Sequence, residues 1–567
     1  MKQIFKYLKP YKWGMIFGLS IKFTGTIVEL ALPWILSHII DDVIPLKEVN
    51  LIIVWGGIMF LCAVVAVTFN IIANQMAAKV ARDTTERVRN DLFSKMISLS
   101  DSQVDKFTLS SLISRATSDT YNIHQIIGMM QRLGVRAPII LIGGIIITLT
   151  LDPVLTLVMI AVMPIIFLAI MYVSKVGVPL YTEVQKRTDD FVRVLREDVT
   201  GIRIIKALSK EDYEKSKFGE KIKATVDEEK KAGMVMSVLN PVMSLCLNVG
   251  TVLVILAGAY RVNSGAIKPG TIIAFLTYVT LILNALLFIS RFFTNYSKAS
   301  ASARRITEVL NAPLELLIED KPLGDKEYAI EFKGVSFSYN NKEENVSDIN
   351  FAIKKGETLG IIGSTGAGKS TLIKLLMRFY DVGSGAIYIN GEDIRSIDTK
   401  ILREKFGVVF QKDFISTETI AENIRFGREI DEEGIKNAAG YAMATDFING
   451  KSNGFGTKVA VRGADLSGGQ KQRMLISRAL AAHPEILILD DSSSALDYKT
   501  DAALRKNLRD HFKGTTTIMI AQRISSIMQA DHICVLEDGC IVGYGTHDKL
   551  VETCDIYNEI SKSQMGE

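Results

Sequence analysis

The chain has 567 residues, of which 48% are hydrophobic and 23% are charged. Its mean hydropathy of +0.22 is unusual for a soluble chain of this length, whereas the charged fraction is near the globular average. A membrane part joined to a soluble part explains both values. The 66 basic and 62 acidic residues leave a net charge of +4, too balanced to indicate a nucleic-acid partner. Five cysteines without a CxxC pair exclude a disulfide scaffold.

Apolar segments before residue 300 predict six membrane-spanning helices, since each approaches or exceeds the roughly 20 residues that cross a bilayer. The predicted spans cover about residues 13–40, 51–78, 125–151, 153–173, 234–262 and 269–297. Four charged residues lie inside the first and third spans: Lys22, Glu29, Arg132 and Arg136. Lys22 and Glu29 are interpreted either as the wall of a polar cavity or as a structural ion pair or snorkelling side chains. Arg132 and Arg136 are interpreted either as groups that attract anionic substrates or lipid head groups or as snorkelling side chains.

The loops between the spans predict the orientation of the chain. The segments after the second and fourth spans are long and carry most of the basic residues, and the N-terminus is also basic. The positive-inside rule therefore places these segments, the N-terminus and everything after the sixth span in the cytoplasm of a multi-pass protein of the cytoplasmic membrane. Both long loops have helical patterns, with turns near residues 101–111 and 204–213.

Residues 328–567 predict a soluble α/β domain with a parallel sheet, after a linker at 301–327. The predicted buried strand 358–362 runs into Gly363-Ser-Thr-Gly-Ala-Gly-Lys-Ser370, and a helical pattern follows. This is GxxxxGK[ST] in its strand–loop–helix setting. Its glycines let backbone N–H groups surround phosphates, Lys369 can reach the β- and γ-phosphates, and Ser370 can hold Mg²⁺.

Two further segments fit the same chemistry. Glu485-Ile-Leu-Ile-Leu-Asp490 is an apolar strand that ends in an acidic residue, as a Walker-B strand requires to place Asp490 near Mg²⁺. Leu466-Ser-Gly-Gly-Gln470 is a glycine-rich turn that opens a helix, which is a typical anion site.

With these motifs, essentially the whole chain resembles the ATP-binding cassette (ABC) exporters, in the form of a type IV half-transporter. The resemblance implies a six-helix transmembrane domain at 1–300, an α/β P-loop nucleotide-binding domain at 328–567, and ATP and Mg²⁺ as ligands. It also implies that segments 101–111 and 204–213 are coupling helices and that Ser494–Asp497 is the D-loop. Tyr339 matches the aromatic residue that stacks on adenine, and Gln411 matches the glutamine that senses Mg²⁺.

The implied roles divide into three sets. The nucleotide-binding residues are Tyr339, Gly363, Ser364, Thr365, Gly366, Ala367, Gly368, Lys369, Ser370, Thr371, Ser467, Gly468, Gly469 and Gln470. The metal-binding residues are Ser370, Gln411 and Asp490. The catalytic residues are Asp491, Gln522 and Gln411.

Three positions depart from the family pattern. Asp491 stands where the family has the glutamate after Walker B, and Gln522 stands where it has the switch histidine. Ala460-Val-Arg-Gly463 replaces Gly-Glu-Arg-Gly before the signature. An aspartate carboxylate is held one methylene farther back, and glutamine cannot titrate. The first two losses resemble the degenerate half of heterodimeric multidrug exporters, whose partner half-transporter keeps the glutamate and the histidine.

The resemblance implies ATP-driven export of hydrophobic or amphipathic small molecules across the membrane, by analogy with heterodimers of this kind. Two alternatives stay open. One is a homodimeric exporter of lipid or peptide with two weak ATP sites. The other is a regulatory or channel subunit that ATP gates rather than drives.

Overall fold

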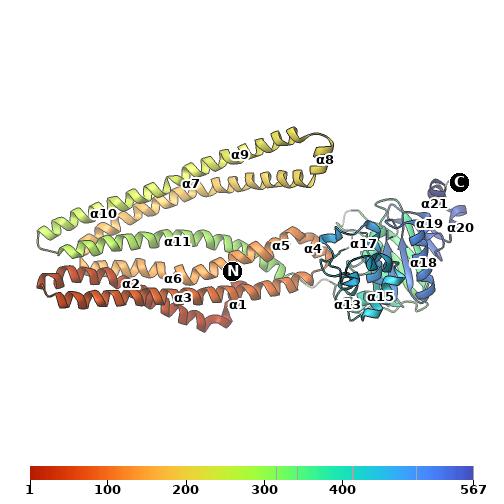
Figure 1. Ribbon diagram of the computed structural model, residues 1–567, viewed down its shortest axis with the longest axis horizontal. Helices are drawn as coiled ribbons and strands as arrows, with labels where there is room; N and C mark the ends of the chain where they lie inside the picture. The colour runs from red at the N-terminus through yellow and green to blue at the C-terminus, as the bar shows by residue number, and fades with distance from the viewer. Residues whose placement is uncertain (314–315, 341–342, 412–413, 493, 566–567) are drawn as a thin grey trace. The chain divides into compact units, whose positions relative to one another are not determined.

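The computed structural model describes residues 1–313, 316–340, 343–411, 414–492 and 494–565. They form two compact units, one of Met1–Ser98 with Leu109–Ala312 and one of Leu99–Thr108 with Pro313–Glu567. The first unit is helical and the second is an α/β domain (Figure 1). This division confirms the predicted fold class, a helical transmembrane domain followed by an α/β domain.

The first unit consists of long helices joined by short turns. Its helices are α1 (Lys2–Leu8), α2 (Lys12–His38), α3 (Val49–Ile97), α5 (Leu109–Ser114), α6 (Thr120–Leu151), α7 (Pro153–Thr200), α8 (Ile202–Ala207), α9 (Glu211–Ser237), α10 (Leu239–Asn263) and α11 (Pro269–Leu310). Within this unit α2 packs against α3, α6 against α11, and α7 against α9, with α8 joining the last two (Figure 1).

All six predicted spans lie on these helices. Among the described residues, four helical stretches are long and apolar enough to cross a membrane: Lys2–Leu46, Val49–Ile97, Leu109–Leu151 and Pro269–Leu286. Two shorter apolar stretches, Pro153–Ile165 and Leu247–Asn263, overlap parts of the predicted fourth and fifth spans. The chain is therefore a multi-pass membrane protein.

The packing of α2, α6, α10 and α11 forms a buried apolar core in the first unit. Leu30, Val254 and Phe275 are at most 2% exposed there. The Tyr278 hydroxyl donates a 2.6 Å hydrogen bond to the Leu30 carbonyl oxygen, so even the polar end of this buried ring is satisfied.

The charged residues of the predicted first and third spans pair differently from what their spacing suggests. Lys22 and Glu29 share one face of α2, yet the Lys22 ammonium donates to Asn70 Oδ1 (2.7 Å) and Asn74 Oδ1 (3.1 Å) on α3. Glu29 instead accepts from Arg136 of α6 at 2.6 Å. The pairing is set by which helices pack together, and spacing along α2 alone does not contain that information.

The second unit contains a four-stranded and a six-stranded sheet. Its strands are β1 (Tyr328–Phe337), β2 (Val346–Lys354), β3 (Thr358–Gly363), β4 (Ser384–Ile389), β5 (Glu392–Asp393), β6 (Phe406–Val409), β7 (Ile486–Asp490), β8 (Thr516–Ile520), β9 (His532–Glu537) and β10 (Cys540–Gly545). The antiparallel sheet has the order β2-β1-β4-β5. The larger sheet has the order β10-β9-β3-β8-β7-β6, and all its pairs are parallel except β10 with β9.

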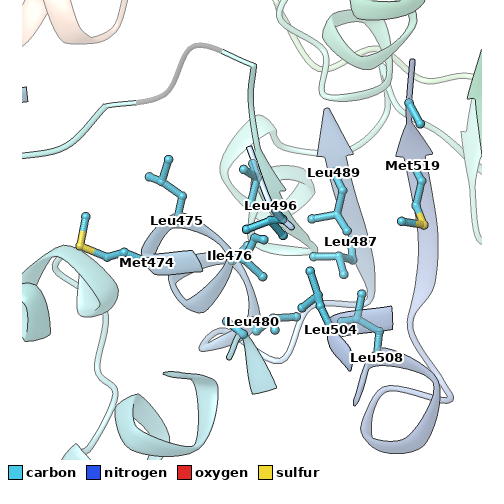
Figure 2. Close-up of a cluster of buried hydrophobic side chains, with 14 of the residues drawn as sticks. Met474, Leu475, Ile476, Leu480, Leu487, Leu489, Leu496, Leu504, Leu508 and Met519 are labelled. Carbon is cyan, nitrogen blue, oxygen red and sulfur yellow. The ribbon is translucent and has the colours of Figure 1, made fainter. Parts of the chain in front are cut away.

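Helices cover both sheets. They are α4 (Asp101–Phe107), α12 (Lys369–Leu376), α13 (Thr399–Glu404), α14 (Ile420–Arg425), α15 (Glu432–Tyr441), α16 (Thr445–Asn449), α17 (Gly468–Leu480), α18 (Tyr498–His511), α19 (Ile524–Ile527), α20 (His547–Thr553) and α21 (Asp555–Met565). Figure 2 shows how α17 packs its apolar face, with Ile476 and Leu480, toward Leu487 and Leu489 of β7. This packing fixes the helix that begins at the glycine-rich turn relative to the strand that ends at Asp490.

The predicted boundaries need one correction. The helix of the sixth span continues to Leu310, so the first ten residues of the predicted linker 301–327 are helical. Residues 301–310 contain no glycine or proline, and nothing in them ends a helix. In addition, the predicted first coupling segment, 101–111, divides into α4 and the start of α5, and α4 belongs to the second unit.

Candidate nucleotide-binding site

The predicted phosphate-binding residues gather at the carboxyl ends of β3, β6, β7 and β8. A cavity of about 210 Å³ opens there. Its lining residues are Asn345, Thr365, Gly366, Gly368, Lys369, Ser370, Thr371, Gln411, Asp490, Asp491, Ile520 and Gln522. Ligands of parallel α/β sheets bind at this edge, because the loops that follow neighbouring strands converge on it.

The loop between β3 and α12 requires glycine at two positions. A Cβ atom on Gly363 would lie 2.1 Å from the carbonyl oxygen of Leu536 in the neighbouring strand β9. Gly368 caps α12 with a φ of +96°, and a Cβ there would lie 2.9 Å from the Asn345 carbonyl oxygen. The loop is therefore held against neighbouring backbone, with the N-terminus of α12 at the cavity.

Lys369, Ser370 and Asp490 provide the charged and metal-binding groups of the cavity. The Lys369 ammonium donates to the carbonyl oxygens of Gly363 (2.8 Å) and Ser364 (2.6 Å). Burial lowers the pKa of Lys369 and raises that of Asp490. Ser370 Oγ donates to Asp490 Oδ2 at 3.3 Å, so a hydroxyl and a carboxylate converge as hard oxygen ligands for Mg²⁺.

Asp491 and Gln522, which occupy the positions of the family's glutamate and histidine, contact each other. Gln522 Nε2 donates a 2.9 Å hydrogen bond to Asp491 Oδ2 across 31 residues of sequence. The Asp491 backbone has a φ of +52°, and its N–H donates to the Ile520 carbonyl oxygen at 3.0 Å. The amide thus engages one carboxylate oxygen, and it can neither accept a proton from water nor carry charge.

Tyr339 lies beside the loop without lining the cavity. The residue is 42% exposed, and its hydroxyl donates to Thr371 Oγ1 at 3.4 Å. The ring meets that of Tyr380 edge-on, with centroids 5.1 Å apart, and the Lys374 ammonium lies 5.3 Å from the Tyr339 centroid. Exposure of an aromatic face next to the phosphate loop is consistent with the predicted stacking on a base.

The signature residues form a separate element. Ser467 caps α17: its hydroxyl accepts from the Gln470 N–H (3.3 Å), while the Gln470 side chain accepts from the Ser467 N–H (3.1 Å). A Cβ on Gly469 would lie 3.1 Å from the Ala495 carbonyl oxygen, so this turn abuts the predicted D-loop. None of the residues lining the cavity described above comes from 466–470.

Helix α4, part of the predicted first coupling segment, packs against the nucleotide-binding fold. The Tyr380 hydroxyl donates to Asp105 Oδ2 at 2.7 Å, and Gln103 Nε2 donates to the Pro313 carbonyl oxygen at 2.8 Å. Burial and the hydrogen bond to Asp105 raise the pKa of the Tyr380 phenol. The sequence did not single out Tyr380 or the cavity residue Asn345, because neither lies in a recognised motif, and within the predicted coupling segment it did not single out Asp105.

The cavity fits a Mg²⁺-bound nucleoside triphosphate. Lys369 and the helix N-terminus supply positive charge, and Ser370 and Asp490 supply metal ligands. When bound, Mg²⁺ neutralises charge on the transferred phosphoryl group. Asp491, predicted to act on the attacking water, lines the same cavity, and Gln522 donates a hydrogen bond to its carboxylate.

Comparison with known proteins also indicates an ATP-binding protein. Residues 15–286 match the family model of the ABC transporter transmembrane region, and residues 346–494 match the family model described as ABC transporter. The uncharacterized ABC transporter ATP-binding protein YfiB of Bacillus subtilis is 35% identical over 574 residues, covering 100% of this chain and 99% of the relative. The putative ABC transporter ATP-binding protein exp8 of Streptococcus pneumoniae is 31% identical, covering 100% of this chain and 97% of the relative.

A solved structure shares the fold. A bacterial Atm1-family ABC exporter with ATP bound superposes with a TM-score of 0.83 at 23% identity, covering 99% of each chain. The chain belongs to the ABC transporter family, and its ATPase domain binds ATP with Mg²⁺.

Proposed function

We propose that this ABC transporter chain is one half of a heterodimeric exporter, in which its own Walker loop forms the slow ATP site. The observation that carries the proposal is the Asp491–Gln522 hydrogen bond at the position of the catalytic pair. The carboxylate is held one methylene farther back than that of the family's glutamate, and the neutral amide beside it cannot accept a proton as a histidine does. The phosphate loop and the capped signature turn retain their geometry.

Separation of the signature from the Walker cavity supports a shared-site arrangement. In such an arrangement, each ATP site combines the Walker residues of one chain with the signature of the other. Ser467–Gln470 of this chain therefore complete the fast site on a partner that keeps the glutamate and the histidine. The partner's signature completes the slow site around Lys369, Asp490 and Asp491. The transported compound, in this proposal, is a hydrophobic or amphipathic small molecule that moves out of the cytoplasm.

The test compares the purified full chain alone and together with the half-transporter with which it co-purifies. We expect the complex to hydrolyse ATP at least about tenfold faster than the chain alone. Glutamate-to-glutamine replacement in the partner should abolish this turnover, whereas Asp491→Asn in this chain should leave most of it. Ordinary exporter rates from the chain alone would refute the heterodimeric assignment.

The same experiment separates the two alternatives. A homodimer with two weak sites predicts that the chain alone has all the activity and that Asp491→Asn removes it. A gated channel subunit predicts ion conductance without ATP turnover. The contact of α4 with Tyr380 favours mechanical coupling over gating, because it joins a predicted coupling segment to the ATPase fold.

A further inference from the structure

The membrane unit contains a group of charges that the ATPase cycle does not use: Lys22 is buried, Glu29 and Arg136 are partly buried, and Arg132 is exposed. Lys22 and Glu29 lie on α2, Arg132 and Arg136 lie on α6, and Lys22 interacts electrostatically with the other three. We refer to Lys22, Arg132 and Arg136 as the basic cluster. Charges inside spanning segments are costly, so a cluster with an excess of one sign requires a compensating group.

The internal contacts of the cluster leave its excess charge uncompensated. Lys22 is 3% exposed and is bound by the neutral side chains of Asn70 and Asn74, which solvate the ammonium without cancelling its charge. Arg132 donates through Nε to the Gly128 carbonyl oxygen, another neutral acceptor. Only the Arg136–Glu29 contact, at 2.6 Å, joins opposite charges among these groups.

The Arg136–Glu29 pair is itself incompletely satisfied. Within the described residues, the buried atoms Arg136 Nε and Glu29 Oε2 have no hydrogen-bond partner. A guanidinium that binds a carboxylate through one nitrogen only keeps donors for a second anion. Arg136 can therefore bind a ligand without giving up its contact with Glu29.

A cavity lies directly beside this arginine. It has a volume of about 260 Å³ between α6 and α11. Its lining residues are Leu133, Arg136, Ala137, Ile140, Leu281, Asn284, Ala285 and Phe288. One cation and one amide thus occur among aliphatic and aromatic side chains, an arrangement that matches a ligand with a small polar head and an apolar body.

We propose that this α6–α11 cavity binds an amphipathic anion, whose carboxylate or phosphate lies at Arg136 and whose apolar body lies along Ile140 and Phe288. This inference rests on the proposed export function and narrows its substrate class from amphipathic to acidic amphipathic. The anion offsets the positive excess of the basic cluster, and Asn284 donates or accepts one further hydrogen bond at the head group. An acidic lipid head group and a free acidic amphiphile share this chemistry.

Photolabelling tests the proposal. The full chain, alone and with its partner, is placed in phosphatidylcholine nanodiscs without ATP, and a twelve-carbon carboxylate bearing a diazirine on its chain is added. We expect labelling of peptides from 133–140 and 281–288, and at least about tenfold less labelling with the uncharged primary amide of the same probe. Equal labelling by the two probes, or labelling only elsewhere, would overturn the proposal.

Variants identify the arginine as the anchor. Arg136→Gln should lower labelling about tenfold or more, and Arg136→Lys should restore part of it, since a charge is kept without the planar fork. Arg193→Gln, on the exposed part of α7, removes an equal charge from the same unit and should change nothing. An Arg136→Gln chain that still binds nucleotide and labels as strongly as the wild type would refute the assignment.

Competition on the wild-type chain needs no variant and separates the sources of the anion. Dodecyl phosphate should displace the probe and dodecyltrimethylammonium should not, and the reverse order would overturn the proposal. Loss of labelling in nanodiscs that contain phosphatidylglycerol would identify a lipid head group as the occupant, whereas persistence would identify a free amphiphile. The labelling experiment contains no ATP, so its outcome does not depend on the ATPase test. ATP hydrolysis by the chain without a partner would refute the heterodimer and would leave the labelling result unaffected.

Discussion

Restoring the catalytic pair should accelerate hydrolysis at this chain's own Walker site. The perturbation is Asp491→Glu combined with Gln522→His. In the structure, Asp491 Oδ2 lies 2.9 Å from Gln522 Nε2, which fixes where the present carboxylate sits. A glutamate extends it by one C–C bond, about 1.5 Å, and a misplacement of about 1 Å can cost on the order of 100-fold in rate.

The backbone conformation at position 491 opposes this gain in turnover. Asp491 has a φ of +52°, in the left-handed region that aspartate tolerates better than most residues. A glutamate there costs up to about 1 kcal/mol more, equivalent to roughly fivefold. The net expectation is therefore an increase in turnover of about 10- to 100-fold.

The assay is phosphate release from a complex whose partner carries a glutamine in place of its Walker-B glutamate, so that only the site of this chain turns over. Asp491→Asn in the same complex is the control, because it keeps the size of the side chain and removes the carboxylate. An unchanged rate in the double variant would refute the reasoning. It would show that geometry outside Asp491 and Gln522 limits the site.

Three further substitutions test other parts of the site. Gly363→Ala forces a Cβ to within 2.1 Å of the Leu536 carbonyl oxygen, so we expect destabilisation of about 3 kcal/mol or more in thermal unfolding; an unchanged melting temperature would contradict the close approach. Ser467→Ala removes the cap of α17, which costs about 1 kcal/mol of stability, and should lower the ATPase rate of the complex. The nucleotide affinity of this chain's own Walker loop, measured by fluorescent-ATP binding, should stay constant. Tyr380→Phe keeps the ring and removes the donor to Asp105, so the ratio of substrate-stimulated to basal ATPase should fall several-fold. Because burial and Asp105 raise the pKa of Tyr380, the wild-type ratio should show no loss between about pH 6 and 9 from ionisation of this phenol.

Elements that depend on short stretches of the chain could be predicted from the sequence, whereas contacts between distant segments could not. Among the described residues, four helical stretches are long and apolar enough to cross a membrane, and the strand before the Walker loop and the strand that ends at Asp490 are both present. Apolar length and glycine spacing predict such elements because they act over short stretches of chain. The position of the sixth helix's end was wrong by about ten residues. Nothing in 301–310 opposes a helix, and the residues that mark its end, Asn311 and Pro313, lie beyond the predicted start of the linker.

By itself, the sequence determined that this protein has a membrane half and an ATP-binding half, and it predicted Asp491 and Gln522 as the catalytic pair. Only the tertiary structure decided that these two side chains hydrogen-bond, that Arg136 and not Lys22 pairs with Glu29, and that Tyr380 contacts Asp105. Each of these contacts joins residues far apart in the chain. They depend on helix packing and strand order, which local patterns of hydropathy and spacing do not encode.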